Sequence, residues 1–454
     1  MKPPLSLSIL LLAGSLAYAG HPKLARDLDT ADPNSTVNVI VQFKDAPTEQ
    51  NQQRMRTRGA RHRTRLASVN GGMYTVSVRD LEALANDPDV EFISPDREVS
   101  GNLDNTIGSI NFWPGITSWY DTNHRAKAQG ISIAFLDSGV NAAHANFKAY
   151  QTTTSRVVYS QSFVGGNTSD QYGHGTHVAG IGSGADNISD QNSNSIRNFW
   201  GTAADSSIVN LKVLDANGRG TDSAVIAGID RAIQLKSTYN IRVMNLSLGR
   251  PVTESYKTDP LCKAVERAWK AGIVVVVAAG NEGRNNSVQN KGYGTITSPG
   301  NDPYVITVGA VNDKQNGWRG DDVIATYSSK GPTQIDHIVK PDLVAPGNRI
   351  VSYQAAGSTL VSQFPANRPP LSAYMSNNGA APSPDFFTMS GTSMATPFVA
   401  GAIAALLGHR PEATIDQIRA TLYNSVHESA SYRNASHGRL NLGSAVAEIT
   451  RSLP

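Results

Sequence analysis

The sequence predicts an α/β protein in which a largely parallel sheet is flanked by helices and preceded by a small α+β domain of ferredoxin-like type. Two observations lead to this prediction. From about residue 105, short apolar runs alternate with stretches of helical length, whereas residues 20–104 form a separate β-α-β-α-β pattern. The chain has 454 residues, which is enough for one large domain and one small domain.

The composition is that of a loop-rich globular protein. Hydrophobic residues make up 39% of the chain, with 40 glycines and 23 prolines. A net charge of +3 is too small to indicate nucleic acid or an acidic membrane surface, so we expect neither as a partner. The single cysteine, Cys262, excludes an intramolecular disulfide, and we expect an inert buried thiol.

Residues 1–19 have the pattern of a signal peptide. Lys2 precedes an apolar stretch at 5–12, and Ala17-Tyr18-Ala19 offers a small-x-small cleavage site. The apolar stretch is short for a membrane span, which needs about 20 apolar residues, although an uncleaved anchor is the alternative. We therefore expect a secreted protein, either extracellular or periplasmic.

Residues 20–104 are expected to fold as their own unit. Strands are predicted at 37–43, 73–78 and 90–93, with helix-compatible segments at 48–67 and 80–86. The first of these segments contains six arginines: Arg54, Arg56, Arg58, Arg61, Arg63 and Arg65. We interpret them as a solvated helix face, with an acidic partner or a processing site as alternatives.

The larger unit shows the alternation of buried strands and helices that is typical of a parallel sheet covered on both faces. Strands are predicted at 131–136, 208–214, 241–246, 273–279 and 304–310. Helices are predicted at 221–236 and 255–271. Ligands of such sheets bind beyond the carboxyl ends of the strands.

A central buried helix is predicted after Gly391-Thr392-Ser393-Met394-Ala395-Thr396-Pro397, because residues 398–407 are apolar on nearly every face. Ser393 would lie at the N-terminus of this helix, where free N–H groups and the helix dipole favour negative charge. A helix cap is the commoner role of such a serine. The rest of the chain must therefore supply a base, an orienting acid and an oxyanion donor.

Three polar residues after predicted strands or at helix starts can fill these roles. Asp137 follows the first strand of the larger unit, His174 opens a helix, and Asn281 follows another strand. Taken singly, each has an ordinary explanation as a turn former, cap or surface residue. A metal site at His174 and His177 is disfavoured, because no glutamate completes the zinc signature His-Glu-x-x-His.

Taken together, these residues predict acyl transfer by a serine nucleophile. Asp137 would orient His174, His174 would take the hydroxyl proton, and Ser393 would attack. Asn281 and the Ser393 backbone N–H would hold the oxyanion. The order Asp, His, Ser differs from that of chymotrypsin and α/β-hydrolases, and the Gly-x-Ser-x-Gly of the latter is absent because Ala395 takes its last position.

At this point the chain resembles the subtilisin-like serine proteases over roughly residues 105–445. The resemblance rests on four motifs in the family's order: Asp137-Ser138-Gly139, His174-Gly175-Thr176-His177-Val178-Ala179-Gly180, Ala279-Gly280-Asn281 and Gly391 to Pro397. It implies catalytic Asp137, His174 and Ser393, with Asn281 in the oxyanion hole. It also implies that 20–104 is a propeptide, an intramolecular inhibitor whose tail blocks the cleft and is cut near residues 100–106.

Peptide binding between exposed strand edges is the mode that such a cleft suggests. By resemblance, Ser247, Leu248 and Gly249 form one edge, with Gly218 and Gly220 on the other, although all of these could be ordinary turn residues. The resemblance places Ala279 and Gly280 on a wall of the main specificity pocket. Thr297 would stand at its base, where many relatives have glycine, and would make the pocket shallower.

Two segments depart from compact members of the family. The polar stretch between Gly347 and Gly391 is long and could border the cleft. The segment 186–192 is rich in oxygen ligands, so structural calcium is possible, although it lacks the spacing of an EF-hand loop. No metal ligand is assigned, and no cofactor is expected to be required for catalysis.

The sequence therefore predicts an exported, monomeric serine endopeptidase that acts on protein or peptide substrates. It would be made as a self-inhibited precursor that processes itself, and its activity would fall in acid when the base is protonated. The alternative is a catalytically silent binding protein of the same shape. An esterase using the same triad is less favoured, because the peptide-binding edges are present too.

Overall fold

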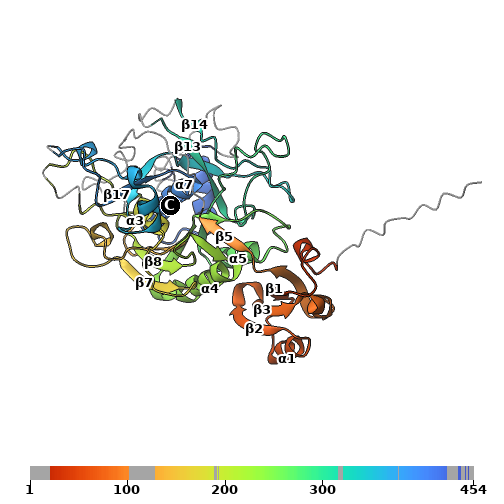
Figure 1. Ribbon diagram of the computed structural model, residues 1–454. Helices are drawn as coiled ribbons and strands as arrows, with labels where there is room; N and C mark the ends of the chain where they lie inside the picture. Colours follow the sequence, from red (N-terminus) through yellow and green to blue (C-terminus); the bar gives the residue numbers. More distant parts are fainter. Residues whose placement is uncertain are drawn as a thin grey trace, which may run out of the picture.

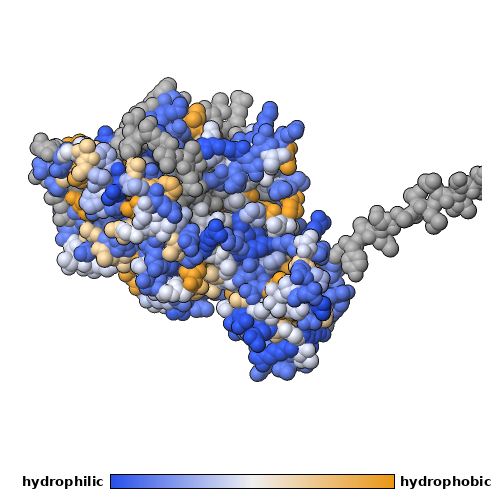
Figure 2. All heavy atoms as spheres, viewed as in Figure 1, coloured by the Kyte–Doolittle hydropathy of each residue, from blue (hydrophilic) through white to orange (hydrophobic). Residues whose placement is uncertain are grey.

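The computed structural model describes residues 21–101, 128–188, 192, 194–314, 321–376, 378–426, 438–440, 445 and 448. Within them the chain forms a small N-terminal unit and a larger α/β unit, and a strand leads from the first into the second (Figure 1). Figure 2 shows the N-terminal unit projecting from the larger body with a mostly hydrophilic visible surface. The predicted signal peptide and the predicted boundary at residue 104 lie outside the described residues.

The N-terminal unit is a four-stranded antiparallel sheet with two helices and its own apolar core. Its strands lie in the order β2-β3-β1-β4, which is the β-α-β-β-α-β arrangement of ferredoxin-like domains. Its elements are β1 (Thr36–Phe43), α1 (Glu49–Thr57), β2 (Arg61–Leu66), β3 (Gly71–Ser77), α2 (Leu81–Ala85) and β4 (Val90–Pro95).

The helix predicted over 48–67 is wrong in its second half. Helix α1 ends at Thr57, Gly59 follows with a φ of +86°, and Arg61–Leu66 forms the edge strand β2. Only Leu66 of this strand is fully buried, so its sequence lacks the apolar alternation by which strands are recognised. Exposed charge on an edge strand discourages pairing with other chains, and three of the six arginines lie there.

The larger unit is built on an eight-stranded sheet in the order β14-β13-β12-β10-β6-β8-β7, with β15 also paired to β13. Every pair is parallel except β13 with β14. The strands are β6 (Ser132–Asp137), β7 (Val157–Ser162), β8 (Ser207–Lys212), β10 (Ile241–Leu246), β12 (Val274–Ala278), β13 (Ile306–Asn312), β14 (Val323–Ile324) and β15 (Leu343–Pro346). The predicted parallel sheet is thereby confirmed.

Helices cover both faces of this sheet (Figure 1). Helices α3 (His174–Ser183) and α7 (Thr392–His409) pack against each other on one side. Helices α4 (Asp222–Tyr239) and α5 (Pro260–Lys270) pack together on the other side, and α8 (Ile415–Asn424) lies against α7. The predicted helix at 255–271 begins later than expected, because Asp259 caps Pro260–Lys270.

Helix α7 is the axis of the core. Within the described part of the chain it is the one helix long and apolar enough to cross a membrane. However, every residue from Thr392 to Leu407 is buried, and the helix packs against strands of the sheet and against α3. Its all-round apolar surface therefore reflects burial inside the protein, as predicted.

The stretch between Gly347 and Gly391 contains regular elements that the sequence analysis did not predict. They are β16 (Ile350–Tyr353), α6 (Thr359–Gln363) and β17 (Phe386–Met389), with β16 and β17 paired as an antiparallel ribbon. The N–H groups of Thr359 and Leu360 donate to the carbonyls of Gln171 and Tyr172. This stretch therefore braces the segment that leads into α3.

Candidate active site

The four residues singled out for catalysis lie at the ends of core elements. Asp137 is the last residue of β6, His174 is the first residue of α3, and Ser393 is the second residue of α7. Asn281 follows β12 by three residues. They occupy the carboxyl-terminal side of the parallel sheet, where ligands of such folds bind.

Asp137 and His174 form a buried hydrogen-bonded pair. The His174 Nδ1 lies 2.7 Å from Asp137 Oδ1, and both side chains are almost completely shielded from solvent. A carboxylate accepts the proton of Nδ1–H, which leaves Nε2 of the neutral ring as an acceptor. No described residue bonds to this Nε2, so it is available to take a proton.

Ser393 and Ser247 bond each other reciprocally. The Ser393 Oγ donates to the Ser247 carbonyl at 2.8 Å, and the Ser247 Oγ donates to the Ser393 carbonyl at 2.9 Å. The structure thus brings Asp137 and His174 into contact, but the Ser393 hydroxyl points its proton at a carbonyl rather than at His174. Rotation about the Cα–Cβ bond of Ser393 changes this acceptor, and such bonds commonly tighten only when substrate is bound.

Asn281 is held next to Ser393 by hydrogen bonds from Thr392, the residue before Ser393. Its Oδ1 accepts hydrogen bonds from the Thr392 N–H at 3.0 Å and from Thr392 Oγ1 at 3.1 Å. Because a backbone N–H can only donate, the bonded side-chain atom is the oxygen. The Nδ2 of Asn281 is buried and has no bond to any described residue.

A short strand from the end of the N-terminal unit lies in the groove beside His174. Strand β5 (Glu98–Gly101) runs antiparallel between β9 (Arg219–Thr221) and β11 (Leu248–Gly249). The Gly101 N–H donates to the Gly218 carbonyl at 3.3 Å. A Cβ atom on Gly101 would lie 3.5 Å from two atoms of the His174 ring. The structure therefore places 218–220 and 247–249 on either side of an extended peptide.

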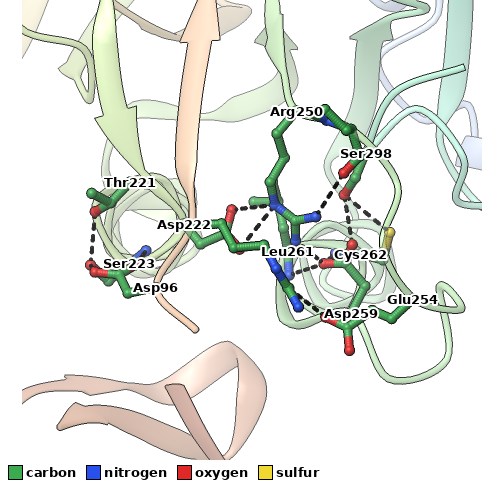
Figure 3. Close-up of polar contacts among 12 residues, drawn as sticks. Asp96, Thr221, Asp222, Ser223, Arg250, Glu254, Asp259, Leu261, Cys262 and Ser298 are labelled. Carbon is green, nitrogen blue, oxygen red and sulfur yellow. Dashed lines mark hydrogen bonds and ion pairs between the residues drawn. The ribbon is translucent and has the colours of Figure 1, made fainter. Parts of the chain in front are cut away.

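The N-terminal unit also contacts the larger unit outside this groove. The carboxylate of Asp96 accepts hydrogen bonds from the N–H and the Oγ of Ser223, at the start of α4 (Figure 3). Conversely, the Asp230 carboxylate in α4 accepts the N–H groups of Ala67 and Ser68. These charge-assisted bonds fix the N-terminal unit at both ends of its contact with α4.

Residues 128–442 match a family model described as Peptidase S8, the subtilase family. The chain belongs to the subtilase family. By family it is a serine-type endopeptidase, that is, a hydrolase.

Several subtilase relatives align over most of this chain. Serine protease AprX of Bacillus subtilis is 29% identical over 401 residues, which cover 86% of this chain and 82% of the relative. Subtilisin E of the same species is 31% identical over 368 residues, which cover 80% of this chain and 77% of the relative.

The fold is also that of a solved structure, fervidolysin from Fervidobacterium pennivorans, described as a keratinolytic enzyme related to subtilisin. The TM-score is 0.64 at 20% identity, and the match covers 94% of this chain. The chain spans 63% of the length of that protein.

Asp170 is a residue of this subtilase site that the sequence analysis missed. It is fully buried, and its carboxylate accepts the N–H groups of Gly173 and Thr176 and the hydroxyl of Ser138, all within 2.7–2.8 Å. Ser138 Oγ in turn accepts the Gly175 N–H at 2.9 Å. Asp170 thus ties the start of α3 to the end of β6.

The predicted pocket residues Ala279, Gly280 and Thr297 lie next to one another. Ala279 follows β12, and its carbonyl accepts the Thr297 N–H at 3.0 Å. Gly280 has a φ of +104°, and a Cβ there would come within 2.7 Å of the Thr297 Cγ2. Only glycine fits this position with threonine opposite, since both the backbone angle and the space exclude a side chain.

His177 also lies on α3 but takes no part in the Asp137–His174 pair. Its Nε2–H donates to the carbonyls of Phe387 and Ile350, at 3.0 and 3.1 Å. Burial, and then the charge of His174, lower the pKa of His177 to about 3. The ring is therefore neutral at pH values well above 3, and its hydrogen bonds join α3 to the β16–β17 ribbon.

The possible calcium segment lies partly outside the described residues, which include 186–188 and 192 but not 189–191. The Asp186 carboxylate accepts the Phe199 N–H, and the Asn187 amide donates to the carbonyls of Ala145 and Lys148. Among the residues that the structure describes, no three His, Cys, Asp or Glu side chains gather in a metal-binding group. The presence of calcium remains an expectation from the sequence.

Asn281→Ala should lower kcat by about 10²- to 10³-fold and change KM little, as loss of the equivalent donor does in subtilisin. The reason is that Nδ2 would bond the oxygen only after it becomes an oxyanion, so its loss affects the transition state and not substrate binding. Steady-state kinetics on a chromogenic peptide measures both constants. Asn285→Ala, an exposed amide four residues later, should match the wild type. A rise in KM without a fall in kcat would contradict the oxyanion role of Asn281.

His177 should make the folded protein less stable in acid. The unfolded chain takes up a proton on this histidine near pH 6.5, whereas the folded protein does so only near pH 3. Between these values the unfolded state binds one more proton than the folded state, so the free energy of unfolding should fall by about 1.4 kcal/mol for each unit by which the pH is lowered. Denaturant unfolding at a series of pH values measures the slope. His177→Gln should reduce the slope of unfolding free energy against pH by the amount that one proton contributes. His337→Gln, on the surface, should leave the slope unchanged. Equal slopes in all three proteins would show that His177 is not the group responsible.

Proposed function

We propose that this subtilase is an exported serine endopeptidase made as a self-inhibited precursor. In this proposal residues 20–104 are the inhibitory propeptide, and residues 105–454 are the enzyme. The observation that carries the proposal is the position of β5, an extended segment of the same chain paired on both edges of the groove with Gly101 against His174. A protease substrate is expected to bind in the same way, as an extended peptide paired with the strand edges of the groove.

The chemistry assigned to the site follows from the positions of its hydrogen-bonding atoms. Asp137 keeps the proton of His174 on Nδ1, so that Nε2 can accept the proton of the Ser393 hydroxyl. Ser393 Oγ then attacks the peptide carbonyl and forms a tetrahedral intermediate. His174 returns the proton to the leaving amine. Water then attacks the acyl-enzyme as His174 takes its proton, and His174 returns that proton to Ser393 Oγ as the carboxylic acid product leaves.

The negative charge of the intermediate needs donors that are already in place. The unpartnered Nδ2 of Asn281 and the Ser393 N–H at the start of α7 are such donors. Neither donor has to reorganise, because Asn281 is anchored through its Oδ1 to Thr392 and the Ser393 N–H belongs to the backbone of α7. The positive end of the α7 dipole adds to the stabilisation of the oxyanion.

Substrates are proposed to take the place of β5. Their backbone would pair with Gly218 and Gly220 on one edge and with Ser247, Leu248 and Gly249 on the other. Ala279 and Gly280 would line the pocket for the side chain at the scissile bond. Thr297 would shorten that pocket, which favours small or medium side chains over large aromatic ones.

Export and processing belong to the same proposal. The signal-peptide pattern of residues 1–19 supports an extracellular or periplasmic location. The tail of the propeptide enters the groove with Gly101 beside His174, which supports cleavage within the few residues that follow. The enzyme is proposed to act as a monomer without a catalytic metal, and loss of thermal stability on addition of a chelator is the test for structural calcium.

The test is to express residues 20–454 and to follow both the mass of the chain and its cleavage of casein. Shortening by about the length of the 20–104 unit, with a new N-terminus just after Gly101 and active enzyme, is the expected result. An intact, folded and inert chain would instead favour a silent binding protein. Hydrolysis of an ester without cleavage of casein would favour an esterase.

A further inference from the structure

Arg97 connects the N-terminal unit to β5 and inserts its side chain between the two units. Its side chain is only 9% exposed, and its Nη1 lies 2.5 Å from Glu254 Oε1 in the larger unit. The other two nitrogens bond Asp27 of the N-terminal unit at 2.9 and 3.1 Å. The Arg97 carbonyl accepts the Asp222 N–H at 2.9 Å, so the backbone is fixed here as well.

The part of the larger unit that receives Arg97 has more buried acids than bases. Arg250 is already bonded to Asp222 and Asp259, each at 2.8 Å, and Figure 3 shows its guanidinium between the two carboxylates. Glu254 lies beside Asp259, with its side chain 8% exposed. One arginine thus faces three carboxylates until Arg97 supplies the second positive charge.

Glu254 is unusual for a buried glutamate because one of its oxygens is left without a partner among the described residues. Its Oε2 is buried and bonds to none of the described residues. Burial, and then the charge of Asp259, raise the pKa of Glu254 to about 7, although Arg97 and Arg250 oppose the shift. A buried carboxylate with one oxygen still free to accept hydrogen bonds is stabilised by a cation. Arginine fits best because its planar guanidinium can donate to both carboxylate oxygens.

When the N-terminal unit leaves, Arg97 and Asp27 leave with it, and Glu254 stays in the enzyme. A substrate that takes the place of β5 keeps the same register, because both edges of the groove fix its backbone. The residue four positions before the one that replaces Gly101 then occupies the place of Arg97. This step rests on the function proposed above.

We propose that Glu254 is a specificity-determining residue that selects arginine in the substrate, four positions before the residue that occupies the place of Gly101. The site lies well upstream of the bond that is cut, so it adds affinity without touching the reacting atoms. Proteins with an exposed, extended segment carrying an arginine at this spacing are the preferred substrates. The tail of the chain itself, with Arg97 at that spacing, is the first example.

The experiment compares two fluorescence-quenched peptides that span residues 94–106 of this chain. One keeps arginine at the position of Arg97, and the other has citrulline, which has the same shape without the charge. Both are assayed with self-processed enzyme at pH 9, where Glu254 is ionised, and mass spectrometry confirms that the same bond is cut. The readout is the ratio of the two kcat/KM values in the wild type, in Glu254→Gln and in Glu412→Gln, a distant exposed glutamate that serves as the charge control.

The expected ratio is about tenfold in favour of arginine for the wild type and Glu412→Gln, as for one hydrogen bond between charged groups. It should fall to about one in Glu254→Gln. A purely structural role of Glu254 would lower both kcat/KM values together and leave the ratio unchanged, which would overturn the inference. So would a wild-type ratio of one with both peptides cleaved, and in that case the proposed protease function stands. If the wild type cleaves neither peptide nor casein, the proposed function itself fails.

Discussion

Ser393→Ala should lower kcat by about a millionfold, as removal of the nucleophile does in subtilisin, and should leave the precursor at full length. The variant lacks the oxygen that attacks the peptide carbonyl, so neither the casein assay nor self-processing can proceed through an acyl-enzyme. The fold should persist, because the lost hydroxyl makes one hydrogen bond, to the Ser247 carbonyl. The loss of one such bond costs about 1 kcal/mol. Mass spectrometry of the purified chain and the rate of casein cleavage measure both effects.

Two further proteins make the result of Ser393→Ala decisive. Ser287→Ala, at an exposed serine in a loop, should process and cleave like the wild type. Wild-type enzyme added to the Ser393→Ala precursor should shorten it, which shows that the bond is accessible and the variant folded. Shortening of the variant on its own, with contaminating proteases inhibited, would exclude Ser393 as the nucleophile.

Asp137→Asn should lower kcat by about 10⁴-fold, the effect of the same change in the triad of another serine protease. The Oδ1 of Asp137 accepts both the Nδ1 proton of His174 and the Ser138 N–H, so the amide oxygen of asparagine is retained there only in one orientation. In either orientation the neutral amide no longer stabilises the imidazolium that forms when His174 takes the serine proton. In the second orientation the amide also donates to Nδ1 and forces the ring proton onto Nε2, which then cannot accept the serine proton.

The measurement is kcat on a peptide substrate, with KM as the check on binding. KM should change little, because neither Asp137 nor His174 belongs to the strand edges β9 and β11 that are proposed to pair with the substrate backbone. Asp416→Asn on the surface of α8 is the control for the loss of one negative charge. A fall of less than tenfold in Asp137→Asn would mean that His174 does not depend on Asp137 for its tautomer.

The fold could be predicted well where burial leaves a clear sequence pattern. The strands of the larger sheet are continuous apolar runs because helices cover both faces, and Val274–Ala278 is the plainest case. Helix α7 was predicted for the same reason, since its apolar residues point in all directions. Edge strand β2 was missed because its arginines face solvent and only Leu66 is buried.

The site could be predicted in part. Asp137, His174, Ser393 and Asn281 were named from motifs, and their placement at the ends of core elements follows from the parallel sheet. Three features are not readable from the chain: the bond from Ser393 to the Ser247 carbonyl, the buried anchor Asp170, and the pairing of Arg97 with Glu254. Each depends on which residues far apart in the sequence come together in space.

Asp170 has a consequence for how the enzyme should fail on heating. Its carboxylate accepts hydrogen bonds from the start of α3 and from Ser138, the residue after Asp137. The Asp137–His174 pair is therefore attached to core elements on both sides. Many enzymes lose activity first, by loosening of a flexible site, and unfold later. Here the hydrogen bonds of Asp170 and Ser138 connect the start of α3 to the end of β6, which are the two elements that carry the pair. Catalysis and core structure should therefore disappear in a single transition.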